Sequence, residues 1–240
     1  MKTGTNISRR GFTLVELLVV IAIIVALAAL ATPQIFKQLK RAAFAEALNN
    51  AKQVKLALDG FATDFDGQYP NEDTMELITG QAEQPSDSNG YFKQLFLSGE
   101  TQSESIFWVK NSPIAGGKPD DSITQGGNIA ESEILEEGDC HWAYMTEQSN
   151  TSNVARPIIL DPYVRDGNQF SAELWDNKVI VVRIDSSATG MRIRFTDIQD
   201  GKGIVRDGSG NNIISSEADA WQGSGENPSE LLEQPLPDNA

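Results

Sequence analysis

A single carboxylate lies inside the long apolar segment near the N-terminus. From Phe12 to Ala31 every residue is apolar except Thr13 and Glu16. A charged side chain costs about 2.5–3.5 kcal/mol at the centre of a membrane helix and less near its end. A plain membrane anchor has no use for such a charge. Glu16 is therefore a candidate functional residue.

The one cysteine and the one histidine are adjacent, as Cys140 and His141. A catalytic Cys–His pair has to be brought together by the fold, whereas neighbours on a strand point to opposite faces. We therefore expect a buried Cys140 beside a surface or capping His141, and no enzyme activity. Nitrogen and sulfur ligands are too few for a zinc site. One cysteine also excludes an intrachain disulfide.

Oxygen donors gather on glycine-rich loops near the C-terminus, at Asp197, Asp200, Asp207, Asn211 and Asn212. Ca²⁺ prefers oxygen ligands of this kind, so these residues are a candidate calcium site. Their spacing departs from the twelve-residue EF-hand loop, and clusters of Asp, Asn and Gly also form ordinary turns. Both interpretations stay open, and no other cofactor is expected.

The composition limits the classes of partner. Of the 240 residues, 34 are acidic and 19 are Lys or Arg, so the formal net charge is −15 and the pI is near 4.4. This balance argues against nucleic-acid binding through a basic face, and no nucleic-acid partner is expected. The length suits one compact domain with extensions.

The apolar segment is long enough to span a membrane. Twenty residues, 12–31, reach about 30 Å as a helix, which is the hydrocarbon thickness of a bilayer. The bases Lys2, Arg9 and Arg10 precede it. The positive-inside rule then places the N-terminus in the cytoplasm and the remainder outside, in a single-pass arrangement.

Two simpler interpretations of this segment compete with a functional one. A secretory signal peptide could be cut near Ala29-Leu30-Ala31, but its apolar region normally has 7–15 residues, and Pro33 crowds that position. An uncleaved signal anchor explains the length and leaves Glu16 unexplained.

A third interpretation comes from the stretch Gly11-Phe12-Thr13-Leu14-Val15-Glu16. With its preceding bases and following apolar run, it resembles the cleavage motif of bacterial type IV prepilins and type II secretion pseudopilins. The resemblance implies that a prepilin peptidase of the inner membrane cuts after Gly11 and methylates Phe12. Pro33 falls where the family commonly carries a helix-disturbing proline.

Glu16 then has a physical role. Cutting after Gly11 leaves a positive amine on Phe12, and a paired amine and carboxylate largely cancel each other's cost in an apolar environment. Between subunits, this pair would set the axial register of a filament, as the resemblance also implies. The implied partners are copies of the chain, other pilin-like subunits and assembly platform proteins. The alternative is a membrane-anchored periplasmic ligand-binding domain that does not polymerise.

The chain divides into five predicted segments. They are a cleaved leader (1–11), a transmembrane helix (12–31), an amphipathic helix (32–66), a periplasmic or extracellular head (67–215) and an acidic, disordered or loosely attached tail (216–240). Pro33 should kink or locally melt the helix, and Gly67 should end it. The acid-Gly-Tyr-Pro end, Asp66 to Pro70, is similar to that of the major pseudopilins.

Sheet signals lie in the second half of the head, at 156–160, at 178–184 and at 191–195, where apolar residues alternate with Arg192 and Arg194. Residues 185–190 should form the turn of a hairpin. In the irregular stretch 71–155, a short helix is expected at 91–96 and a strand at 105–109. The predicted fold class is α+β, with a long N-terminal helix packed on a small antiparallel sheet, as in pilins.

Overall fold

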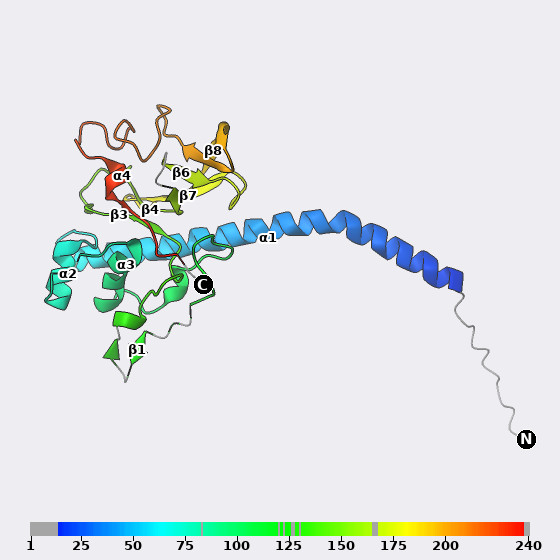
Figure 1. Ribbon diagram of the computed structural model, residues 1–240, viewed down its shortest axis with the longest axis horizontal. Helices are drawn as coiled ribbons and strands as arrows, with labels where there is room; N and C mark the ends of the chain where they lie inside the picture. Colours follow the sequence, from blue (N-terminus) through cyan, green and yellow to red (C-terminus); the bar gives the residue numbers. More distant parts are fainter. Residues whose placement is uncertain are drawn as a thin grey trace, which may run out of the picture. The chain divides into compact units, whose positions relative to one another are not determined.

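The computed structural model describes residues 14–82, 84–119, 121, 123–125, 128–129, 131–164 and 168–237. These residues belong to two compact units, Met1–Ala42 and Ala43–Ala240. The second unit is called the head below. Helix α1, Leu14–Asp64, contributes to both units (Figure 1).

Helix α1 is not interrupted at Pro33, which lies inside it. The sequence predicted a kink or local melting of the helix at Pro33, and the continuous helix shows that local melting is absent. Proline removes one backbone hydrogen bond, but its fixed φ suits a helix, so an apolar helix with strong neighbouring turns can continue through it.

Helix α1 ends in a turn that requires glycine. Asp66 and Gly67 have φ values of +50° and +85°, and the Gly67 amide donates to the Ala62 carbonyl at 2.7 Å. Glycine adopts such a φ without steric cost, which is why it commonly follows a helix. The predicted stop at Gly67 is confirmed.

Residues on both sides of this turn fasten the end of α1 to the rest of the head. Tyr69 is buried, and its hydroxyl donates to Asp59 at 3.1 Å. Lys55, also buried, forms an ion pair with Asp59 and donates to Ser186 at 3.3 Å. The Tyr144 hydroxyl donates to the Pro70 carbonyl at 2.9 Å. The Gly-Gln-Tyr-Pro stretch therefore has a structural role.

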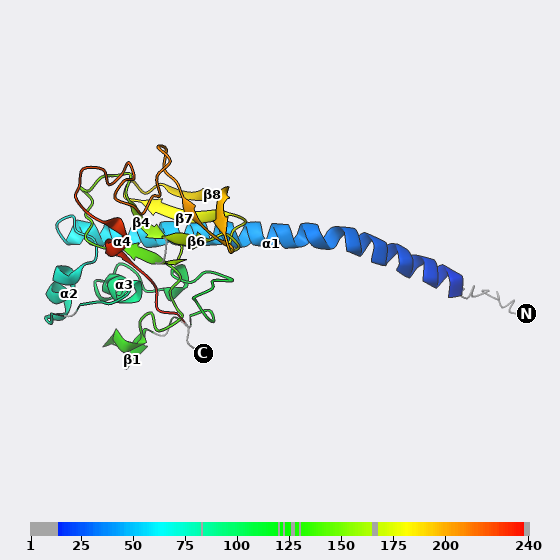
Figure 2. The same ribbon diagram turned by 45° about the horizontal axis from the view of Figure 1, so that its top comes forward.

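An antiparallel sheet of eight strands forms the centre of the head, in the order β10-β3-β4-β7-β8-β9-β6-β5. The strands are β3 (Ala143–Met145), β4 (Pro157–Leu160), β5 (Tyr163–Val164), β6 (Gln169–Ser171), β7 (Lys178–Arg183), β8 (Ala188–Gln199), β9 (Lys202–Val205) and β10 (Leu232–Glu233). The strands predicted from 156, 178 and 191 correspond to β4, β7 and β8. The α+β fold is confirmed (Figure 2).

Both faces of the sheet are covered. Along β7, Ile180 and Val182 pack into one apolar cluster with the head part of α1, whereas Val179 and Val181 pack into another. A strand that is buried on both faces reads as a continuous apolar run, which is the pattern of Val179 to Val182.

The C-terminal segment covers the second face, so the expectation of a disordered tail at 216–240 is wrong for the described part, up to residue 237. Ala218 and Trp221 are buried in the second cluster, and β10 pairs with β3 through Leu232. Helix α4, Pro228–Leu231, precedes β10. The acidic composition of this stretch led to the prediction of disorder. Its few apolar residues nevertheless bury enough surface to order the chain (Figure 1).

The stretch between α1 and β3 has structure of its own. It contains helices α2 (Glu72–Thr79) and α3 (Ser88–Leu97), the 3-10 turns η1 (Glu104–Ile106) and η2 (Glu131–Glu133), and a separate pair of strands, β1 (Thr124–Gln125) and β2 (Asn128–Ile129). The helix expected at 91–96 is confirmed within α3. The strand expected at 105–109 is wrong, because Phe107 is buried against Phe92 of α3, with ring centroids 5.1 Å apart, and not in a sheet.

Candidate functional site

The candidate functional site is the start of α1. Glu16 lies in the first turn of the helix, where the positive end of the helix dipole favours a carboxylate. Gly11 and Phe12, the predicted positions of cleavage and methylation, lie outside the described residues. The structure places Glu16 and Pro33 on one continuous helix.

The helix around Glu16 presents an apolar surface. Residues 14–32 are all exposed, including Leu14 at 79% and Leu30 at 76%. Within the described residues, α1 is the one helix long and apolar enough to cross a membrane, by length and composition. Apolar surface of this extent marks contact with a membrane or with other chains.

Two of the predicted calcium ligands, Asp197 and Asp207, make other contacts through their carboxylates. Asp197 accepts two hydrogen bonds from Arg206, at 2.8 and 3.0 Å, and this pairing lowers the pKa of its carboxyl group. Asp207 accepts from the backbone amides of Asn211 and Asp219. These are the contacts of an ion pair and of an ordinary turn.

Asp200 is exposed in the turn between β8 and β9, with φ at +49°. The amide of Asn211 donates to the Glu217 carbonyl, and that of Asn212 donates to the Asn168 carbonyl. In the described part of the chain, no group of three or more His, Cys, Asp or Glu side chains is placed to hold a metal ion. Calcium binding at Asp197, Asp200, Asp207 and Asn211 stays a prediction.

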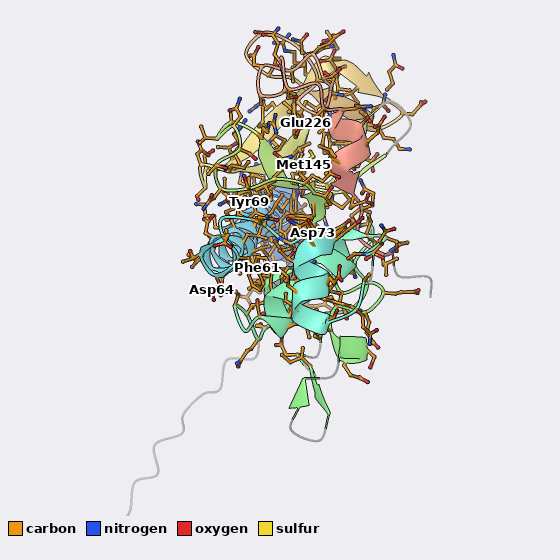
Figure 3. The ribbon with its side chains drawn as sticks, turned by 90° about the vertical axis from the view of Figure 1, so that its left-hand side faces the viewer. Phe61, Asp64, Tyr69, Asp73, Met145 and Glu226 are labelled. Carbon is orange, nitrogen blue, oxygen red and sulfur yellow. The ribbon has the colours of Figure 1, made fainter. Side chains whose placement is uncertain are left out.

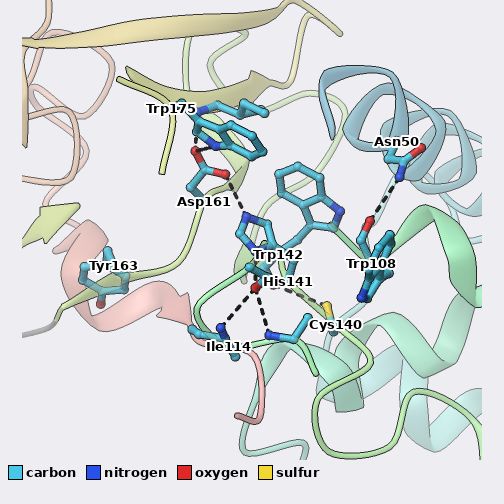
Figure 4. A network of polar contacts seen from close by, with 12 residues as sticks. Asn50, Trp108, Ile114, Cys140, His141, Trp142, Asp161, Tyr163 and Trp175 are labelled. Atoms are coloured by element: carbon cyan, nitrogen blue, oxygen red, sulfur yellow. Dashed lines mark hydrogen bonds and ion pairs between the residues drawn. The ribbon is translucent and has the colours of Figure 1, made fainter. Parts of the chain in front are cut away.

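The sequence led us to expect a surface or capping position for His141. The structure shows instead that His141 is fully buried. Its Nδ1 atom is 2.7 Å from the Ser112 hydroxyl and its Nε2 atom is 2.9 Å from an Asp161 carboxylate oxygen (Figure 4). The sequence alone did not indicate these partners of His141, because Ser112 and Asp161 are distant from it along the chain.

A Ser–His–Asp arrangement can activate a serine nucleophile, but this one is built differently. The backbone amides of Ile114 and Ala115 donate to the Ser112 hydroxyl, at 3.1 and 2.8 Å. In a hydrolase such donors stabilise the substrate oxyanion instead. Here they hold the hydroxyl itself, so the arrangement fastens a loop to the sheet.

Cys140 is buried, as expected. Burial raises the pKa of its thiol to about 12, and only the thiolate is nucleophilic. The thiol instead donates a weak hydrogen bond to the Trp142 carbonyl at 3.7 Å. It is an inert part of the core.

Comparison with known proteins decides the class of the chain. The family described as "Prokaryotic N-terminal methylation motif" matches residues 7–32, a range that includes Gly11, Phe12 and Glu16. The type IV major pilin protein PilE1 of Neisseria gonorrhoeae is 28% identical over 148 residues, which cover 51% of this chain and 80% of that protein. The chain is a type IV pilin-like protein. No solved structure gives a significant match.

The motif and the similarity to a pilin support a structural subunit, and structural subunits of the pilin family are not enzymes. The N-terminal motif carried this assignment from the sequence alone. The buried His141 network and the C-terminal apolar anchors were not recognised in that way. Their partners meet only in the folded head, so no local spacing could show them.

Proposed function

We propose that this pilin-like chain is a subunit of a type IV pilus-like filament, cut after Gly11 by a prepilin peptidase and N-methylated on Phe12. The observation that carries the proposal is the methylation motif at residues 7–32, which continues into an exposed apolar helix. The similarity to a major pilin supports a pilus subunit.

The proposed route begins in the inner membrane. Lys2, Arg9 and Arg10 favour a cytoplasmic N-terminus, and the head would lie on the periplasmic side. Removal of the leader exposes the amine of Phe12, which Glu16 of a neighbouring subunit meets during assembly. The apolar helices then leave the lipid and pack against each other. The surface that contacted lipid in the membrane thereby becomes the contact surface between subunits.

A second candidate is a pseudopilus of type II secretion. It is favoured by the Asp-Gly-Gln-Tyr-Pro stretch at the end of α1, which is similar to that of major pseudopilins. The structure explains this stretch by packing: Gly67 turns the chain, and Tyr69 is buried.

A shearing experiment tests the proposal. Filaments sheared from the surface of the source bacterium should contain the chain as a component, whereas the alternative of a non-polymerising membrane anchor predicts that it stays entirely in the membrane fraction. Assembly only when the chain is overproduced, together with loss of a secreted protein when its gene is deleted, would favour the pseudopilus.

A further inference from the structure

A groove of about 760 Å³ lies on the head beside α1. Its walls come from α1, around Leu56 and Gly60, and from the segment after α3, around Glu100 and Ile106. Leu56 is 72% exposed, although the same helix buries Val54 and Leu58. The groove therefore offers apolar surface that the head itself does not cover.

Two carboxylates without an ion pair to any described residue give this region its charge: Glu100 in the lining of the groove, and Asp64 beside it. Asp59, the other acid of the lining, is paired with Lys55. Glu100 lies directly over α1, where a Cβ atom on Gly60 would come within 2.0 Å of its Oε2 atom. Asp64 is exposed at the end of the helix (Figure 3). Within the part of the chain that the structure describes, neither has an ion-pair partner. Desolvation and the charge of Asp64 raise the pKa of Glu100, so a nearby cation would stabilise its ionised form.

The first unit presents the complementary surface, at residues 35–41 of α1. Ile35 and Leu39 are exposed at 56% and 57%, and they share one side of the helix because they are four residues apart. Lys37 and Arg41, also exposed and four residues apart, share another side. Neither base has an ion-pair partner among the described residues.

We propose that residues 35–41 of one copy dock in the Leu56–Glu100 groove of another copy. The apolar side of the segment covers Leu56 and Ile106, and its bases meet Glu100 and Asp64. This inference rests on the proposed function, since it names a contact between subunits of the filament.

Charge complementarity selects a second copy as the occupant. The net charge is −15, so contacts between two acidic heads are unfavourable unless a basic element enters between them. Residues 37–41 hold three of the chain's 19 bases. The two patches are different surfaces, so the contact is heterologous, and a heterologous contact that does not close into a ring propagates as a filament.

Charge reversal in the source bacterium tests the contact. Glu100→Lys and Arg41→Glu should each lower the amount of the chain in sheared filaments about tenfold relative to its total amount, as expected for reversal of a desolvated interfacial pair. The double variant restores opposite charges and should recover at least half of the wild-type yield. Asp64→Lys replaces Glu100→Lys if the latter does not accumulate in the membrane.

The matched controls are Glu76→Lys and Lys110→Glu, which make the same charge changes at exposed positions outside the groove. They should leave the filament yield within about twofold of the wild type. Unchanged assembly of the single variants, or a double variant no better than the worse single one, would overturn the proposed contact alone. If the wild-type chain is absent from sheared filaments, the proposed function itself fails.

Discussion

The Glu16→Leu variant should remain anchored and folded in the membrane and yet be lost from filaments, by at least about tenfold. Leucine lowers the cost of inserting the helix, since a carboxylate there costs up to about 3 kcal/mol. Assembly, by contrast, should fail because the Phe12 amine of the neighbouring subunit no longer has a carboxylate to pair with. The measurement is the ratio of the chain in sheared filaments to the chain in membranes.

Two further variants separate charge from shape. Glu16→Gln keeps the size of the side chain and removes its charge, so it should assemble as poorly as Glu16→Leu. Glu46→Leu removes an exposed acid from the same helix and should assemble normally. Equal filament yields for Glu16→Leu and the wild type would exclude the amine–carboxylate pairing.

The largest effect on stability is expected from Asp161→Ala. This buried carboxylate accepts from the Trp175 indole at 3.1 Å and from the Ile180 amide at 2.6 Å, and its other oxygen contacts His141. Removal leaves these buried groups without an acceptor. We expect the free energy of unfolding to fall by about 3–5 kcal/mol, and the melting temperature to fall by roughly 10 °C.

Near-UV circular dichroism of the full chain in detergent can follow this transition, because Trp142 and Trp175 are buried in the same region. Asp219→Ala removes an exposed carboxylate and should change the free energy of unfolding by less than about 0.5 kcal/mol. A melting temperature of Asp161→Ala within about 2 °C of the wild type would show that the network does not hold the head together.

Local patterns predicted the elements that depend on local chemistry. The helix from Leu14 follows from its apolar run and helical spacing, and Gly67 marks its end because the turn needs a positive φ. Strand β7 was recognisable from its run of valine and isoleucine. Glu16 stood out because a carboxylate conflicts with its apolar surroundings.

Elements that depend on distant contacts were missed. Trp221 and Leu232 lie in an acidic, glycine-rich and proline-rich stretch that reads as disordered, yet the second face of the sheet needs a cover, and they supply it. The continuous burial of β7 implied such a cover. His141 acquired its role from Asp161 and Ser112, which only the fold brings near.

The mass of the mature chain tests the central claim most directly. Mass spectrometry of the subunit isolated from filaments and membranes should show that residues 1–11 are absent and that the N-terminal Phe12 is methylated. This cleavage removes Lys2, Arg9 and Arg10, so the net charge changes from −15 to −15 − 3 = −18. A chain that still begins at Met1, or one that begins at Thr32 after cutting by a signal peptidase, would contradict the account.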